Sequence, residues 1–77
     1  MRKRIPLEFC RVGDRGKIAE LATFDRRMLG KLMSLGIVPG TTVQLLRKKP
    51  GIIVQAGYTK VALDRRLAGL IVLEIKG

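Results

Sequence analysis

Apolar and polar residues alternate with two different periods along the chain, and the change of period marks the expected elements. Between residues 28 and 35 the apolar positions recur at spacings of three and four, which is typical of one face of an α-helix. These positions are Met28, Leu29, Leu32, Met33 and Leu35. Asp25 precedes them, and its carboxylate suits the free backbone amides and the positive end of a helix. The pattern therefore predicts a helix that begins after Asp25.

A segment rich in turn residues predicts where this helix ends. Gly36 stands where a left-handed C-terminal cap belongs, because glycine adopts a positive φ without a Cβ clash. In a Schellman-type ending, Ile37 would pack against Leu32. Pro39 and Gly40 then suit the two central positions of a type II turn. We therefore expect the chain to reverse between residues 36 and 40 and to continue as a strand.

After this turn the apolar period shortens to two, which is typical of half-buried strands. We expect strands over residues 42–47, 52–55, 59–63 and 70–75. Another strand should precede the helix and end near Leu21. Asp64 and Gly69 would begin and end one helical turn. The sequence therefore predicts a single mainly β domain, residues 1–77. We expect a small closed barrel of about five strands, with a helical insertion between the first two main strands and a short helical turn before the last.

The first residues and a few isolated side chains lead to simpler expectations. Residues 1–4 form a basic tip, which we expect to be frayed and to act as a solubilising terminus. Cys10 is expected to be a small buried apolar residue, because no histidine lies near it to activate the thiol. Phe9 and Phe24 are expected to lie in the core of so small a domain.

Sixteen Lys and Arg residues against six Asp and Glu residues give the 77-residue chain a formal net charge of +10. This sign favours an acidic partner: nucleic acid, an anionic membrane surface or an acidic protein surface. The sequence has no His and one Cys, so it offers no clustered site for zinc or another transition metal. One cysteine forms no internal disulfide, which fits a reducing cytoplasm, and no apolar run approaches the ~20 residues that span a bilayer.

No arrangement of polar side chains in the sequence favours catalysis. The carboxylates are scattered without a pair suited to general acid–base chemistry, and there is no Ser-His or Cys-His set. Gly13 and Gly16 lack the surrounding sequence of a phosphate loop. We therefore predict a binding module that is not an enzyme and that holds no cofactor or metal.

Three classes of partner remain open at this point. A nucleic acid would suit the charge, and residues 12–18 resemble the KOW motif of ribosomal and transcription-factor barrels. Against it, aromatic residues are 4% of the chain, and single-strand platforms use exposed aromatics for stacking. A protein partner, or a second copy in a homo-oligomer, would suit a second aliphatic set: Leu46, Ile53 and Val72. These side chains could contact such a partner if they are partly exposed, but not if the curvature of the strands buries both faces of the sheet.

The order of several short motifs resembles the FeoA family, small cytoplasmic proteins of bacterial ferrous iron uptake. The resemblance begins with Pro6-Leu7 and residues 12–18. The helix signature follows as residues 31–40, KLMSLGIVPG, with lysine at Lys31 where the family usually has arginine. The remaining matches are residues 42–50, 57–63 and 68–72, so that the resemblance reaches almost from end to end.

The resemblance implies a fold and a role. The fold is an SH3-like barrel, which the resemblance also implies for the C-terminal domain of DtxR-type iron-dependent repressors. The role is that of a non-enzymatic accessory or regulatory protein that docks on the cytoplasmic side of FeoB, a membrane transporter with a cytosolic G domain. The chain would then be cytoplasmic and peripherally associated with the inner face of the membrane through this partner.

The expected docking surface lies on the helix and nearby loops. The residues that we expect to contact the partner are Arg26, Arg27, Leu29, Lys31, Met33, Arg47 and Tyr58. On the helix the cations would supply charge and the two apolar residues would supply contact area, while Arg47 and Tyr58 are weaker candidates. The alternative function is a small basic nucleic-acid-binding barrel of SH3 or KOW type that uses residues 47–49 and the basic terminus. Its phosphate contacts would make binding fall steeply with salt.

Overall fold

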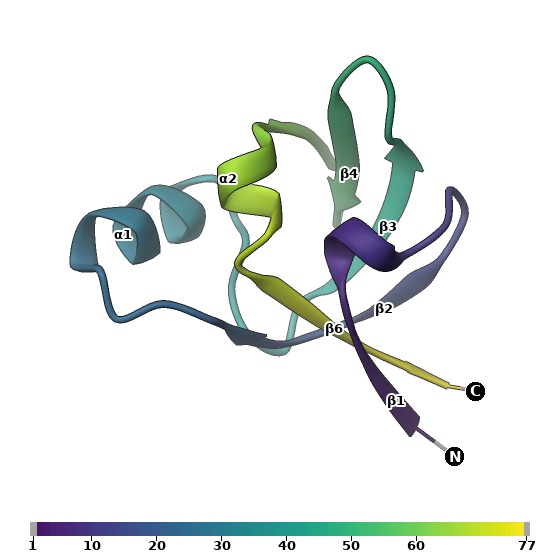
Figure 1. Ribbon diagram of the computed structural model, residues 1–77, viewed down its shortest axis with the longest axis horizontal. Coiled ribbons are helices and arrows are strands. Elements are labelled where there is room, and N and C mark those ends of the chain that lie inside the picture. The colour runs from purple at the N-terminus through teal and green to yellow at the C-terminus, as the bar shows by residue number, and fades with distance from the viewer. Residues whose placement is uncertain (1, 77) are drawn as a thin grey trace.

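Six antiparallel strands form one sheet in the computed structural model, which describes residues 2–76 (Figure 1). In chain order the elements are β1 (Arg2–Pro6), the 3-10 helix η1 (Leu7–Phe9), β2 (Arg15–Leu21), α1 (Arg26–Ser34), β3 (Thr42–Arg47), β4 (Ile52–Ala56), β5 (Thr59–Leu63), α2 (Arg65–Ala68) and β6 (Ile71–Lys76). The mainly β class is confirmed, as are the helix inserted between β2 and β3 and the short helix before the last strand.

The order of the strands in the sheet is β1-β6-β2-β3-β4-β5. The last strand therefore lies inside the sheet, between β1 and β2, while β1 and β5 occupy its two edges. The six strands have the architecture of a small SH3-like fold, as expected. One expectation is corrected here: the sheet does not close into a barrel through a pairing of its edges.

The expected frayed terminus is also wrong for residues 2–4, and Met1 lies outside the described residues. Arg2 pairs with Lys76 and Arg4 pairs with Glu74, in a ladder that continues to Pro6. Apolar periodicity gives no sign of this strand, because its ladder uses backbone groups and its exposed side chains are basic. Ile5, opposite the buried Leu73, is partly buried against the core.

The core gathers side chains from β2, β3, β4, β5 and β6 around the interior of the curved sheet, and Ile5 of β1 packs partly buried against it. In β6, Ile71 and Leu73 are buried, while the alternating Val72 and Glu74 are half-buried. The buried apolar residues are Leu7, Cys10, Ile18, Leu32, Ile37, Val43, Leu45, Ile52, Val54, Val61, Leu63, Leu67, Ala68, Ile71 and Leu73. No polar or charged residue in the described part of the chain is buried. The predicted burial of Cys10 is confirmed.

β2 and β6 approach each other unusually closely at Gly16. A Cβ atom built on Gly16 would lie 2.5 Å from the backbone oxygen of Glu74 and 2.9 Å from Cγ1 of Ile75. The missing side chain is therefore a packing requirement of the sheet at this crossing.

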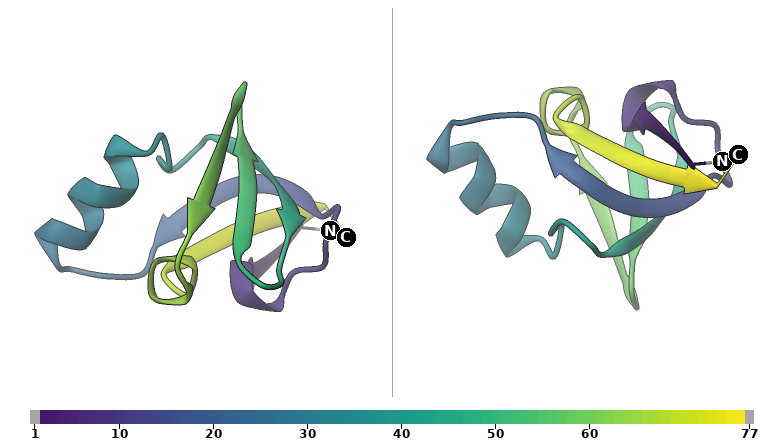
Figure 2. Two further views of the ribbon diagram at one scale, coloured as in Figure 1. Left: turned by 90° about the horizontal axis from the view of Figure 1, so that it is seen from above. Right: turned by 90° about the horizontal axis from the view of Figure 1, so that it is seen from below.

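Helix α1 projects from one end of the molecule. In Figures 1 and 2 it stands beyond the sheet, and the paired ends of β1 and β6 lie at the opposite end. No helix among residues 2–76 is long and apolar enough to cross a membrane.

Candidate functional site

Helix α1 begins with the predicted cap. Oδ1 of Asp25 accepts a hydrogen bond from the backbone amide of Arg27 at 2.9 Å. The backbone amide of Asp25 in turn donates to Oγ1 of Thr23 at 3.1 Å. These bonds orient the first turn and satisfy one of the free amides at the helix start.

The helix ends in the predicted Schellman motif. The amide of Gly36 donates to the carbonyl of Met33 at 3.0 Å, and the amide of Ile37 donates to the carbonyl of Leu32 at 2.9 Å. Gly36 has a φ of 85°, and Leu32 and Ile37 are 0% and 1% exposed within the same core cluster. This ending turns the chain back and fixes the C-terminal end of α1 to the core.

The predicted type II turn then ties the returning chain to β2. The amide of Thr41 donates to the carbonyl of Val38 at 3.0 Å, and Gly40 has a φ of 93°. The amide of Gly40 donates to the carbonyl of Ile18 at 2.8 Å, and the amide of Ile18 donates to the carbonyl of Thr41 at 2.9 Å. The base of the insertion is therefore held by backbone bonds, while α1 extends away from it.

One side of α1 packs on the domain and an adjacent side exposes apolar atoms. Leu32 is buried, and Met28 packs partly buried against the core. Leu29 is half-buried outside the core cluster, and Met33 is 52% exposed. Residues four apart lie above one another on a helix, so Leu29 and Met33 form a short apolar stripe turned away from the core.

Helix α1 carries three cations, and all are exposed. At about 100° per residue, Arg26 lies next to the Leu29 and Met33 stripe, whereas Arg27 and Lys31 lie together on the opposite side of the helix. Within residues 2–76 the one ion pair joins Arg2 and Glu74, so these helix cations form no ion pair with a carboxylate there. The structure thus brings the five predicted helix residues onto one projecting element.

Phe24 is exposed directly before α1, contrary to the prediction that it lies in the core. Its side chain is 103% exposed, directly before the cap residue Asp25. Phe9, at 72%, is also exposed rather than buried. A sequence signal for Phe24 was its place outside both apolar periods, between Thr23 and Asp25. We define the α1 surface as Phe24, Arg26, Arg27, Leu29, Lys31 and Met33.

The structure does not bring Arg47 and Tyr58 to the α1 surface as one site. Arg47 pairs with Ile53 at one end of the β3–β4 hairpin, and its Nε donates to the carbonyl of Lys49 at 3.1 Å. Tyr58 is 104% exposed in the turn after β4, at the other end of that strand. Arg47 therefore has a local role in its own turn.

The basic loop of the alternative nucleic-acid function is partly engaged within the domain. Nζ of Lys48 donates to the carbonyls of Glu8 at 3.0 Å and Cys10 at 2.8 Å. This lysine joins the β3–β4 turn to η1 and its following residues. Its half-buried position differs from that of the exposed Arg47 and Lys49 beside it.

The second aliphatic set falls between the two expectations for it. Leu46, Ile53 and Val72 are all half-buried. Leu46 lies where the β3–β4 register shifts, which separates it from the regular alternation of the ladder. These side chains do not form a fully exposed apolar face.

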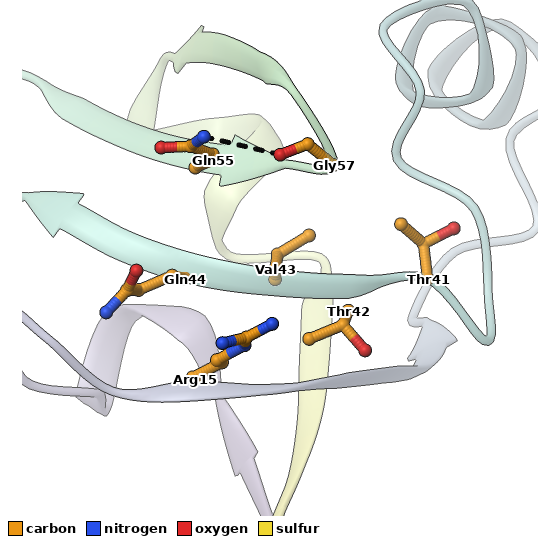
Figure 3. A pocket seen from close by; sticks show the side chains of 7 residues that line it. All are labelled: Arg15, Thr41, Thr42, Val43, Gln44, Gln55 and Gly57. Atoms are coloured by element: carbon orange, nitrogen blue, oxygen red, sulfur yellow. Dashed lines mark hydrogen bonds between the residues drawn. The ribbon is translucent and has the colours of Figure 1, made fainter.

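A polar depression of about 370 Å³ lies beside β3, at the end of the hairpin that carries Tyr58 (Figure 3). It is lined by Arg15, Thr41, Thr42, Val43, Gln44, Gln55 and Gly57. Nε2 of Gln55 donates to the carbonyl of Gly57 at 3.3 Å, and Nε2 of Gln44 donates to the carbonyl of Gly13 at 3.3 Å. These groups offer hydrogen bonds and one positive charge, and the lining carries no carboxylate or thiol for acid–base or nucleophilic chemistry.

Cys10 has the chemistry of a packing residue. Its side chain is 1% exposed, and its Sγ lies 3.6 Å from the carbonyl oxygen of Pro6. Burial raises the pKa of the Cys10 thiol above its ordinary value, and the nearby charge of Asp14 raises the pKa further against the opposing effect of Lys48. Among residues 2–76 no group of three or more His, Cys, Asp or Glu side chains is placed to hold a metal ion.

Comparison with known families and structures gives one consistent result. The family model described as FeoA domain matches residues 5–75. A crystal structure of an iron uptake regulatory protein (FeoA) is 28% identical, with a TM-score of 0.85 over 95% of this chain and 99% of that one. No curated protein sequence matches the chain.

Two further structures extend the comparison to longer chains. Iron(II) transport protein A from Clostridium thermocellum is 26% identical, with a TM-score of 0.82 over 92% of this chain and 45% of that one. A manganese-dependent transcriptional repressor is 25% identical, with a TM-score of 0.87 over 99% of this chain and 44% of the repressor. The same fold therefore occurs as part of a longer chain, a manganese-dependent transcriptional repressor.

Proposed function

We propose that this chain, which belongs to the FeoA domain family, is a non-enzymatic accessory protein of ferrous iron transport that docks on the cytoplasmic side of the FeoB transporter. The observation that carries the proposal is the family match over residues 5–75, almost the whole chain. Structures of similar sequence are named for iron uptake regulation and iron(II) transport. The identity of the partner and the docking surface go beyond this family match and are argued separately.

The α1 surface is the proposed contact with the transporter. Its exposed apolar atoms lie on Phe24, Leu29 and Met33, Arg26 borders the helical stripe, and Arg27 and Lys31 are exposed on the other side of α1. Apolar residues that provide contact area, with charged residues outside them, are the usual composition of a specific protein interface. Because α1 projects beyond the sheet, a partner reaches this patch without disturbing the core (Figure 2).

The proposal assigns a binding role because carboxylates of the chain have structural tasks. Asp25 and Asp64 cap the two helices through backbone amides, and Oδ2 of Asp14 accepts from the amide of Arg11 at 2.8 Å. Glu74 pairs with Arg2. A peripheral location at the inner face of the membrane follows from docking on the transporter, since the chain itself is not proposed to enter the bilayer.

The test is recovery of the transporter from detergent-solubilised membranes by the tagged chain. Arg27→Glu with Lys31→Glu reverses two charges of the α1 surface, and we expect recovery to fall at least about tenfold, as for removal of an interface hot spot. Arg65→Glu with Arg66→Glu makes the same charge change on the exposed surface of α2 and serves as the control. Circular dichroism checks that each variant is folded.

Equal recovery of the transporter by the wild type and the α1 variant would refute this docking surface. Failure of the wild type to recover any transporter would refute the partner. Both results are distinguishable from misfolding because the far-ultraviolet spectrum is recorded for each protein.

The nucleic-acid alternative gains one observation from the structure: Phe9, Phe24 and Tyr58 are all exposed rather than buried. Exposed aromatics stack on bases, and the net charge of +10 favours phosphate contacts. The aromatics lie on η1, on the segment before α1 and on the β4–β5 turn, so they form no common platform. Recovery of nuclease-sensitive material that disappears with salt, in place of the transporter, would favour this alternative.

A further inference from the structure

The outer face of strands β1, β6 and β2 carries two rows of charged side chains. Antiparallel partners share one face of a sheet, so Arg2 and Lys76 lie side by side, as do Arg4, Glu74 and Lys17. Arg15 precedes Lys17 by two residues and therefore shares its face. The cations of this face are Arg2, Arg4, Arg15, Lys17 and Lys76, all of them exposed, and we call them the basic sheet face.

The charge of this face is nearly uncompensated. Glu74 is the one carboxylate within the two rows, and its Oε2 lies 3.8 Å from Nη1 of Arg2. Glu20, which pairs with Val72 beyond the register shift of β2, marks where the basic sheet face ends. Five cations against a single carboxylate leave a strong local excess of positive charge.

Four of the five cations, all but Arg4, line one shallow hollow. A depression of about 420 Å³ is lined by Arg2, Arg15, Gly16, Lys17, Thr42, Glu74 and Lys76. Gly16 contributes only backbone to this lining, between the side chains of Arg15 and Lys17. The row continues onto β3, where Figure 3 shows Thr42 and Gln44 beside Arg15. The surface thus suits anionic oxygen atoms approaching from outside the sheet.

We infer that the basic sheet face binds the anionic lipid surface of the membrane on which the transporter lies. This inference rests on the proposed function, which brings the chain to that membrane. Phosphate contacts alone would also suit nucleic acid, but the exposed aromatics Phe9, Phe24 and Tyr58 lie on other elements. A face with cations and without stacking residues matches lipid headgroups better than single-stranded bases.

The position of this face lets it act together with the α1 surface. The paired ends of β1 and β6 lie at the opposite end of the molecule from α1 (Figure 2). One end can therefore contact the transporter while the other contacts lipid. Two weak contacts joined in one rigid body raise the overall affinity well above either one, since the second contact forms at high effective concentration.

The test is flotation of the full chain with two kinds of vesicle. One is made of phosphatidylcholine alone, and the other also contains about 30 mol% phosphatidylserine, which makes its surface anionic. We expect binding to the anionic vesicles only. Each cation near an anionic membrane contributes about 1 kcal/mol, or roughly fivefold in affinity. Arg15→Gln with Lys17→Gln should therefore weaken binding about 25-fold. Arg65→Gln with Arg66→Gln removes the same charge from α2 and should weaken it much less.

Three results would overturn the inference: no binding to anionic vesicles, an equal loss in the two charge variants, or tighter binding to a single-stranded oligonucleotide than to vesicles at the same salt. Leu29→Ser with Met33→Ser separates this inference from the proposed function, because it changes no charge. That variant should lose the transporter in detergent and keep vesicle binding. The Arg15→Gln and Lys17→Gln variant should do the reverse, so failure of one surface is visible without failure of the other.

Discussion

The sheet and the α1 insertion are stabilised in different ways. The sheet carries two ladders on each interior strand, and its buried side chains come from every strand but β1. The insertion between Leu21 and Thr42 has one buried residue in its helix, Leu32, with Ile37 buried after it. Its remaining connections to the domain are partly buried side chains and backbone bonds at its base.

The difference teaches which part of the domain is available for recognition. The sheet uses its apolar side chains for its own stability, so its outer face exposes charge. The helix leaves Phe24, Leu29 and Met33 in contact with solvent, although burial of such side chains would be favourable. A partner that covers them gains this free energy on binding. Truncation of an apolar side chain should therefore lower the stability of the fold when the residue lies in the sheet. On α1 it should instead weaken partner binding.

The largest effect is expected from a leucine pair that tests this division directly. Leu73 is 0% exposed in β6, and Leu73→Ala should lower the free energy of unfolding by about 2–5 kcal/mol. Leu29→Ala removes the same atoms from the half-exposed side of α1 and should cost less than about 1 kcal/mol. Urea unfolding followed by circular dichroism measures both. Equal losses would show that α1 is as much a part of the core as β6.

A glycine pair should change stability in opposite directions. Gly16→Ala would place a Cβ atom 2.5 Å from the oxygen of Glu74, so β2 and β6 must move apart, at a cost of about 1–3 kcal/mol. Gly30 in α1 has nothing within 4 Å of the corresponding position, and Gly30→Ala should stabilise the helix by up to about 1 kcal/mol. The same unfolding experiment measures the sign. A loss of stability in Gly30→Ala would mean that another part of the domain contacts this side of α1.

The smallest effect is expected from pH, which should change the free energy of unfolding through the buried Cys10 thiol. Burial raises the pKa of Cys10 in the folded chain, whereas the unfolded thiol ionises near its ordinary pKa of about 8.5. Stability is therefore intact below that pH and falls as pH rises towards the folded pKa, by at most about 1.4 kcal/mol per pH unit. Cys10→Ala should flatten this fall as pH rises above the ordinary thiol pKa. If the free energy of unfolding falls equally with pH in the wild type and in Cys10→Ala, Cys10 is not the group responsible.

Local chemistry made α1 and its boundaries predictable from the sequence. The cap at Asp25, the Schellman ending at Gly36 and the turn at Pro39-Gly40 each depend on residues within five positions of one another. The later strands were equally accessible, because β3, β4 and β5 form consecutive hairpins with regular alternation. In these segments the local preference and the final structure agree.

Features that depend on distant parts of the chain were not predictable. β1 pairs only with β6, about 70 residues away, and its basic side chains hide the strand from any search for apolar alternation. The separation of Arg47 from α1 likewise depends on the register of β3 with β4. Phe9 and Phe24 were misplaced because an apolar residue need not be buried, a rule that holds in one direction only.

The interior position of β6 has a consequence for synthesis. Translation makes β6 last of the six strands, yet it fills the place between the first two, β1 and β2. Until Ile71–Lys76 emerges, the growing chain holds β2 with one free edge and β1 with no partner, both of them open to pairing with other chains. Their basic side chains repel a second copy during this interval. We therefore expect the charge of β1 and β2 to disfavour aggregation of the nascent domain until this interior strand is made.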